Sequence, residues 1–212
     1  MKKIERRQKI VDAGRILFAT QGFEQTTMQN IADEVAIGVA TVFRHFPRKE
    51  LILFEIVSQL YKDQIPRFEH IENLGISPLE KVNLILEAYI DYLSEENFEM
   101  TKILETFELY VAFYDVEDEV LAQIQRVFRL IPALITRILE QGQQDGSIRS
   151  NLESPKIVTT IINLFGTAIK KYSLHASTKS LASYMPAVEE LYTVKDFLIE
   201  HVIKNNEKEA ET

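Results

Sequence analysis

Apolar residues recur at helical spacing along almost the whole chain, and this pattern constrains the fold more than any other feature. One example lies between two glycines, where apolar residues occupy positions i, i+3, i+4 and i+7: Met28, Ile31, Ala32 and Val35. No convincing run of alternating β-branched residues stands between turn signals. The sequence therefore predicts an all-α protein.

Glycines, prolines and capping residues divide this pattern into segments. We expect helices over residues 5–21, 28–35, 39–45, 47–61, 78–94, 97–114, 117–141, 154–173 and 186–204. Pro66 and residues 73–78 are expected to form a connection, and Pro132 to kink the helix in which it lies. Residues 142–155 are predicted to form the clearest loop of the chain.

The composition excludes several classes of protein. The chain has 212 residues, of which 46% are hydrophobic and 26% charged, as in globular rather than disordered proteins. The lack of cysteine excludes a disulfide framework, a thiol nucleophile and a cysteine-ligated zinc site. No apolar run approaches the roughly 18 residues of a membrane span, and the basic start lacks the features of a secretory signal. We therefore expect a cytoplasmic protein with no membrane partner.

An enzyme is the main alternative from another class, and the sequence offers little support for it. Its histidines lie far apart, without metal-ligand spacing: His45, His70, His175 and His201. Gly-rich phosphate loops and a nucleophile elbow are absent, and paired carboxylates such as residues 95–96 are typical of exposed helix charge. We expect no catalytic residues, no metal and no cofactor.

The charge is distributed unevenly along the chain. The net charge is −8, but residues 1–50 carry nine Lys and Arg against six Asp and Glu, a net of +3, which leaves −11 for the rest. Screening over roughly 8 Å at physiological salt makes nearby charges count most, so a basic segment on an acidic body can still bind phosphate. The acidic residues 205–212 are expected to form a flexible tail.

Two short helices joined by a tight turn, at 28–35 and 39–45, predict a helix-turn-helix unit packed on the first helix. In the second of these helices Val42 and the following Phe46 can face inward, together with Ile37 of the turn. The residues left for its outer side are Val39, Ala40, Thr41, Phe43, Arg44 and His45. Methyl groups there suit thymine, and the Arg and His donors suit a base or a phosphate.

The order of residues over 22–52, GFEQTTMQNIADEVAIGVATVFRHFPRKELI, resembles the DNA-binding signature of the tetracycline-repressor (TetR) family. The matching residues are Gly22-Phe23, Thr27, Ile31-Ala32, Thr41, His45-Phe46 and Lys49-Glu50-Leu51. The resemblance covers residues 10–51. It implies a three-helix DNA-binding domain at 1–50 and a larger helical domain for effector binding and dimerisation at 51–204.

The family resemblance also implies roles for single residues. Thr27 and Lys49 would contact DNA phosphates, and the six outer residues of helix 39–45 would face the major groove. The implied function is that of a homodimeric transcriptional repressor, released from a palindromic double-stranded DNA operator by a small hydrophobic or amphipathic ligand. Lys49 as a solvated side chain and Thr27 as a simple helix cap are the alternatives.

Three departures from the family signature fall in and next to helix 39–45. The turn reads Ala36-Ile37-Gly38 where Gly-Val-Ser is usual, so a hydroxyl cap on the recognition helix is absent. Ala40 replaces a frequent glycine, and Phe43 replaces a tyrosine whose hydroxyl commonly reaches phosphate. We expect DNA binding to survive, with altered affinity or site preference.

The later helices offer candidate residues for ligand binding and dimerisation. An aromatic-lined pocket with polar contacts is predicted from Tyr89, Tyr92, Thr101, Phe107, Tyr110, Tyr114, Phe128 and Asn163. A four-helix dimer interface, implied by the resemblance, is predicted from Ile161, Phe165, Ala168, Ile169, Leu191, Leu198 and Val202. For both sets, the alternative to a role in ligand binding or dimerisation is that these residues pack within the core of one chain. A filled core would favour a second function, that of an architectural or chromosome-associated DNA-binding protein without an effector.

Overall fold

The computed structural model describes residues 3–91, 98–175 and 188–202, and the elements within them are α-helices. This confirms the all-α prediction. The chain forms two compact units, one of residues 1–63 and 98–127 and the other of residues 64–97 and 128–212. Among the described residues, no helix combines the length and the hydropathy that a membrane span requires.

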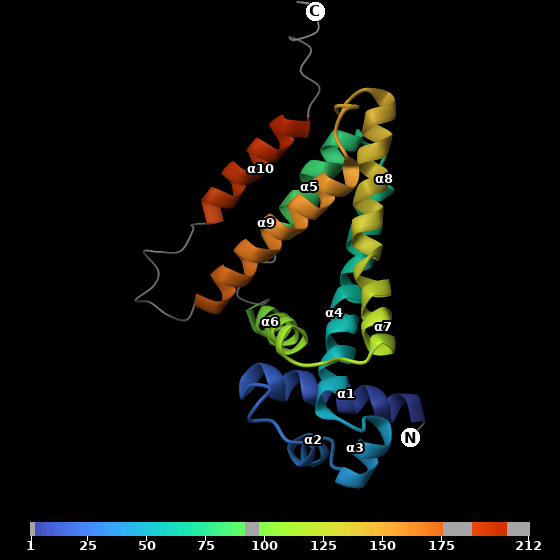
Figure 1. Cartoon of the computed structure of the whole chain (residues 1–212), viewed down its shortest axis with the longest axis vertical. Helices are drawn as coiled ribbons and strands as arrows, with labels where there is room; N and C mark the ends of the chain where they lie inside the picture. The colour runs from blue at the N-terminus through green and yellow to red at the C-terminus, as the bar shows by residue number, and fades with distance from the viewer. Residues whose placement is uncertain (1–2, 92–97, 176–187, 203–212) are drawn as a thin grey trace, which may run out of the picture. The chain divides into compact units, whose positions relative to one another are not determined.

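The first unit contains the three N-terminal helices, α1 (Lys3–Thr20), α2 (Met28–Glu34) and α3 (Val39–His45). It also contains α6 (Phe98–Phe113), the first part of α4 (Lys49–Glu72) and nearly all of α7 (Asp118–Phe128). α2 packs against both α1 and α3, and α1 also packs against α6 (Figure 1). α1 approaches α4 closely at Gly14, where an added Cβ would lie 2.6 Å from Cγ2 of Ile52.

The second unit is built on one apolar core. Its helices are the end of α4, α5 (Pro78–Asp91), α8 (Leu130–Asp145), α9 (Ser154–His175) and α10 (Val188–Val202). α5 packs against α8, α9 and α10, and α8 packs against α9 (Figure 1). Ile85, Leu86, Ile135, Ile138 and Phe165 are fully buried in this core.

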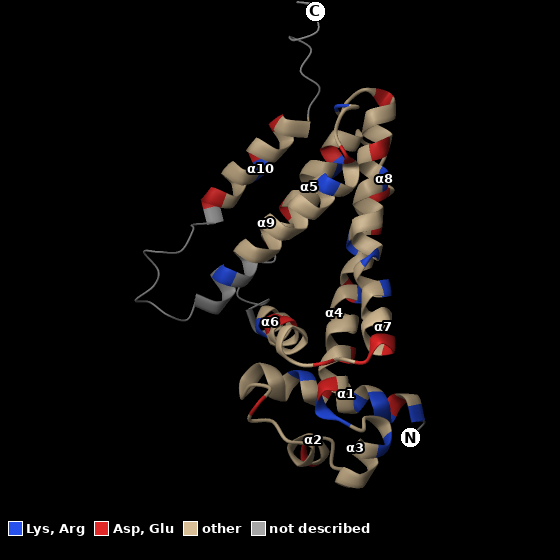
Figure 2. Cartoon of the chain, in the orientation of Figure 1, with Lys and Arg blue, Asp and Glu red and all other residues tan. Residues whose placement is uncertain are grey.

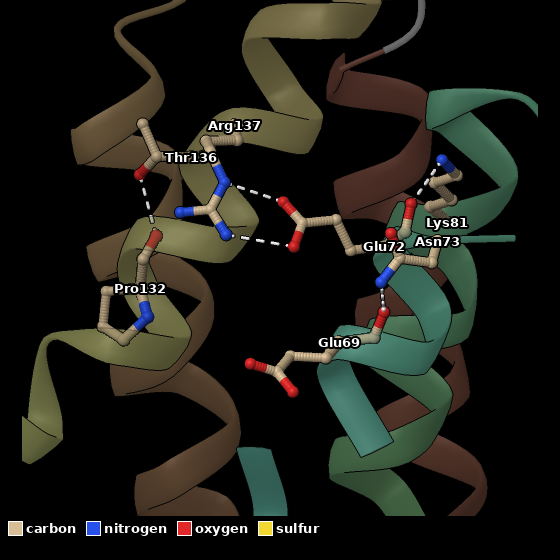
Figure 3. Close-up of polar contacts among 7 residues, drawn as sticks. All are labelled: Glu69, Glu72, Asn73, Lys81, Pro132, Thr136 and Arg137. Carbon is tan, nitrogen blue, oxygen red and sulfur yellow. Dashed lines mark hydrogen bonds and ion pairs between the residues drawn. The ribbon is translucent and has the colours of Figure 1, made fainter. Parts of the chain in front are cut away.

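Side chains from two other helices hold the C-terminal end of α4 (Figure 3). Arg137 of α8 donates from Nε to Oε1 of Glu72 at 2.7 Å and from Nη2 to Oε2 at 3.0 Å. The buried Lys81 of α5 donates to the main-chain carbonyl of Glu72 at 2.7 Å, and Asn73 donates to that of Glu69 at 2.8 Å. Because the last four carbonyls of a helix have no partner within it, these donors complete the end of α4.

The prediction of a connection at Pro66 was wrong, because Pro66 lies inside α4. A proline there removes one helix hydrogen bond and costs about 3 kcal/mol. Phe68 and Ile71 follow within two turns and are 1% and 6% exposed. Burial of such side chains contributes about 1.5–3 kcal/mol each, which offsets that cost and lets the helix continue to Glu72.

The long helix predicted at 117–141 is divided into α7 and α8, which begins after Arg129. Pro132 lies in the first turn of α8 and makes no kink in the middle of a helix, because the first N–H groups of a helix have no intrahelical partner. α8 continues to Asp145 and ends at Gly146, whose φ of +81° is the left-handed conformation of a helix C-cap. The predicted loop at 142–155 is therefore helical over its first four residues. Residues 92–94, 97, 186–187 and 203–204 of the predicted helices, and the tail at 205–212, lie outside the described residues.

Candidate nucleic-acid interface

The turn between α2 and α3 is tight and strained. Ala36 has a φ of +56°, in the left-handed region that is costly for any residue with a Cβ. Two main-chain hydrogen bonds close the turn, from Ala36 to Asp33 at 3.0 Å and from Ile37 to Ala32 at 2.9 Å. Gly38 then caps α3 without a side-chain hydrogen bond, as the departure from the family signature predicts.

α3 has one buried side and one exposed side. Val42 and Phe46 are 0% and 2% exposed and fix the helix to the rest of the unit. The six residues predicted for the outer side are all exposed or half-buried: Val39, Ala40, Thr41, Phe43, Arg44 and His45. Nη2 of Arg44 donates to Oγ1 of Thr41 at 2.9 Å, which orients two of the predicted contact residues together.

Thr27 starts α2 through a reciprocal cap. Its Oγ1 accepts from the main-chain N–H of Asn30 at 3.1 Å, and its own N–H donates to Oδ1 of Asn30 at 2.9 Å. This arrangement is a capping box with asparagine in the place of the usual Glu or Gln. The Thr-x-x-Asn spacing in the sequence carried the signal for this pair, of which only the threonine was predicted as a functional residue.

Basic side chains gather at the end of α3. Burial first, and then the positive charges of Lys3, Arg6, Arg44 and Arg7, lower the pKa of His45 below its usual 6.5. Figure 2 shows the Lys and Arg residues along α1 and next to α3. The guanidinium of Arg7 lies 4.4 Å from the centre of the Phe46 ring and forms an ion pair of 2.8 Å with Glu55. The surface beside α3 is therefore cationic, although the whole chain is acidic.

Lys49 has partners that the sequence did not indicate. Its Nζ donates to the main-chain carbonyls of Phe23 at 2.6 Å and Thr26 at 2.9 Å, and the side chain is half-buried. The predicted phosphate contact would depend on the one remaining N–H donor. Sequence reasoning missed these partners because main-chain carbonyls in a loop leave no residue signature.

The residues predicted for a ligand pocket divide between the two units. Phe107, Tyr110, Tyr114 and Thr101 belong to the first, and Tyr89, Phe128 and Asn163 to the second. Tyr92 lies outside the described residues.

Four aromatic rings of this set pack against other rings within their own unit: Tyr89, Phe107, Tyr110 and Tyr114. Phe107 is 6% exposed and meets the Phe54 ring edge-on at 5.5 Å. Tyr89 contacts Phe68 at 5.6 Å and Phe165 at 6.2 Å between ring centres. Thr101 is buried, whereas Asn163 is exposed on α9.

The residues predicted for a dimer interface lie on α9 and α10. Four of these residues are buried in the core of the second unit: Ile161, Phe165, Leu191 and Val202. Ala168 and Leu198 are half-buried against the same core, and the side chain of Ile169 lies outside the described part of α9. This burial agrees with the alternative of packing within the core of one chain, and the dimer interface stays a prediction.

A short exposed helix with a cationic border, held on a capped partner helix, defines a DNA-binding protein of the helix-turn-helix class. Residues 10–56 match the model of bacterial regulatory proteins of the tetR family, and residues 78–188 match that of the tetracyclin repressor-like C-terminal domain. The chain therefore belongs to the TetR family of DNA-binding transcriptional regulators, as the sequence predicts.

Curated relatives and solved structures agree with this assignment. The chain is 30% identical to an HTH-type transcriptional regulator of Staphylococcus aureus over 105 residues, 50% of this chain and 55% of that one. The repressor KstR2 of Mycolicibacterium smegmatis is 22% identical over 79% of both chains.

Among solved structures, the transcriptional regulator FadR of Bacillus subtilis, in complex with stearoyl-CoA, has a TM-score of 0.71 at 19% identity. That match covers 92% of this chain and 98% of FadR. A protein of Saccharomonospora viridis in complex with choline has a TM-score of 0.74 at 17% identity, over 96% of this chain and 100% of that one. At these identities the likeness shows the fold.

Proposed function

We propose that the protein is a homodimeric repressor that binds a palindromic DNA site through α3 and is released by a small hydrophobic or amphipathic ligand. The observation that carries this proposal is the exposed side of α3, with its Thr41–Arg44 hydrogen bond and its cationic border. In the helix-turn-helix class such a side enters the major groove.

The proposed contacts divide into base readers and phosphate contacts. Thr41 and Val39 offer methyl groups to thymine, and Arg44 offers donors to a guanine edge. Phe43 is 47% exposed and packs on a sugar or a thymine methyl. Ala40 allows a close approach of the helix, and His45 and Thr27 contact phosphates.

The dimer is proposed on geometric grounds, because one short helix makes too few base contacts for a specific site. A dimer reads two half-sites about 34–36 Å apart. The apolar side chains available for this on α9 and α10 are Leu164, Tyr192 and Phe197, which are 46%, 43% and 66% exposed. They lie on the same two helices as the interface residues predicted from the sequence.

The effector is proposed for the region matched by the C-terminal family model. FadR of Bacillus subtilis was solved with stearoyl-CoA, and the Saccharomonospora viridis protein with choline. The stearoyl-CoA complex supports an amphipathic small molecule as the class of ligand. Of the predicted pocket residues in the second unit, Tyr89 and Phe128 are half-buried, so a ligand beside them requires these rings to move.

A second candidate function is that of a chromosome-associated DNA-binding protein without an effector. Two observations favour it: the aromatic rings are packed against one another, and a nucleoid occlusion factor of Vibrio atlanticus is 26% identical over 66% of this chain. A ligand that weakens DNA binding distinguishes the two functions. By linkage, DNA must weaken the binding of that ligand by the same factor.

The proposed function is tested by selecting duplexes from a randomised pool with the full chain and measuring gel shifts. We expect a palindromic site bound by a dimer, and Arg44→Ala to lose about 1–3 kcal/mol of discrimination at one base position in each half-site. Arg129→Ala, an exposed arginine before α8, is the matched control and should bind like the parent protein. Selection of no sequence, or equal loss in both variants, would contradict the proposal. Addition of stearoyl-CoA or choline then tests the release.

A further inference from the structure

The first residue of α4, Lys49, holds the loop between α1 and α2 in place. Its ammonium group binds the carbonyl oxygens of Phe23 and Thr26 and lies 4.2 Å from the centre of the Phe23 ring. Burial lowers the pKa of Lys49, while the charges of Glu24 and Glu50 oppose that shift. One ammonium group therefore fixes two carbonyls and one ring of the same loop.

The loop in turn determines where α2 begins. Thr26 is 1% exposed, and its hydroxyl donates to the carbonyl of Gly22 at 2.7 Å and accepts from Nε2 of Gln21 at 3.1 Å. The next residue is Thr27, the N-cap of α2. A displacement of the Thr26 carbonyl therefore displaces the start of α2, which packs against the recognition helix α3.

The Phe23 ring also connects this loop to α6. It meets the Tyr110 ring edge-on at 5.9 Å, and Tyr110 meets the Phe54 ring of α4 at 5.7 Å. Phe23 is 7% exposed, so its ring has little room to turn independently of these neighbours. α6 lies within residues 78–188, the part matched by the C-terminal family model.

We propose that Lys49 is a positioning residue for DNA binding, which links α6 to the start of α2 through Phe23 and Tyr110. Lys49 acts on the placement of α3 through the loop, and its charge does not serve as a phosphate contact. A movement of Tyr110 changes the packing of Phe23, whose carbonyl Lys49 binds. The inference rests on the proposed function, because it assigns the route by which the effector domain acts on α3.

The salt dependence of DNA binding separates positioning from phosphate contact. A duplex is first selected by the intact protein, so that failure of the proposed function appears as failure to select any sequence. Lys49→Met is then compared with Lys62→Met, which changes an exposed lysine of the same helix. We expect affinity to fall about tenfold at every salt concentration with an unchanged slope, whereas loss of a phosphate contact lowers the slope by about 0.9. A reduced slope would overturn the proposal.

The link to α6 is tested with Tyr110→Leu, and Tyr110→Phe is its control because it keeps the ring. We expect Tyr110→Leu to weaken DNA binding about threefold or more. The same change should have a smaller effect in the Lys49→Met background, because Tyr110 and Lys49 both act through the Phe23 ring. Independent effects of the two changes would overturn the link.

If Lys49→Met does not fold, hydrogen exchange of the Tyr110 variants, measured without DNA, still tests the proposal. The reporter is the Ile31 amide, which donates to the carbonyl of Thr27 at 3.3 Å in the first turn of α2. It should exchange faster in Tyr110→Leu than in Tyr110→Phe. Equal exchange in the two variants would exclude a route from α6 to the start of α2.

Discussion

The two units of the chain are stabilised in different ways. In the second unit, apolar side chains of five helices form a single core, in which Ile85, Ile135 and Ile138 are fully buried. The helix-turn-helix part of the first unit contains short helices, and its loops are fixed by single side chains such as Thr27 and Lys49. A helix of seven residues is not stable alone, so α2 and α3 depend on these contacts.

This difference indicates which substitutions destabilise each unit. A broad apolar core loses stability when volume is removed from it, and the loss depends little on any one polar contact. A small unit that depends on helix caps and on closely packed helices loses stability when one hydroxyl group is removed or one methyl group is added. The following predictions test this contrast, from the largest expected effect to the smallest.

Removal of volume from the core of the second unit should have the largest effect. Phe165 is 0% exposed, and Phe165→Ala should lower the free energy of unfolding by about 3–5 kcal/mol. Leu130→Ala, at a side chain that is 47% exposed, should change it by less than about 1 kcal/mol. Denaturant unfolding of both variants measures the difference, and similar midpoints would contradict a tightly packed core.

Addition of one methyl group should separate the close approach of α1 and α4 from an open helix position. Gly14→Ala places a Cβ 2.6 Å from Ile52 and should destabilise the first unit by about 1–3 kcal/mol. Gly166→Ala on α9 meets no atom within 4 Å and should stabilise its helix by about 0.5–1 kcal/mol. Thermal unfolding of the two variants should therefore shift in opposite directions, and shifts of the same sign would argue against the close approach.

Loss of the α2 cap should have a smaller effect that is confined to the first unit. Thr27→Ala removes the oxygen that accepts from the Asn30 N–H, at a cost of about 1 kcal/mol. Thr27→Ser keeps that oxygen and should behave like the parent protein. Hydrogen exchange should accelerate in α2 and not in α5, and acceleration in both helices would show that the two units do not respond separately.

The smallest effect concerns pH and His45. Its pKa is lowered in the folded chain, so below about pH 6.5 the unfolded chain binds more protons and stability falls as the pH decreases. DNA phosphates favour the protonated ring, so affinity for DNA should rise over the same range. His45→Gln should abolish both trends, whereas His70→Gln, in the second unit, should leave them intact. Trends that persist in His45→Gln would assign the titration to another group.

The sequence predicted local structure well where the signals are local. The bounds 39–45 of α3 and its uncapped start follow from Gly38, the apolar spacing and the absence of a hydroxyl. It failed at Pro66, where burial of Phe68 and Ile71 outweighs the helix-breaking tendency of proline. Tertiary burial of this kind is not visible in a local window of sequence.

The candidate site shows the same division. The outer side of α3 was predicted correctly as a surface, because the buried Val42 and Phe46 fix which side faces out. The dimer interface stays a prediction, since an apolar helical face has the same spacing whether it meets its own chain or another. The Lys49 contacts were missed because their acceptors are main-chain atoms of a loop, which no residue type marks.

The positive φ of Ala36 has a consequence for the evolvability of this protein. A residue with a Cβ pays about 1–2 kcal/mol in that conformation, and glycine does not. One nucleotide change converts any alanine codon into a glycine codon, so the chain holds a reserve of stability one mutation away. A protein with Ala36→Gly can tolerate destabilising substitutions on α3 that would otherwise unfold the domain. Its descendants can therefore evolve to bind new DNA sequences.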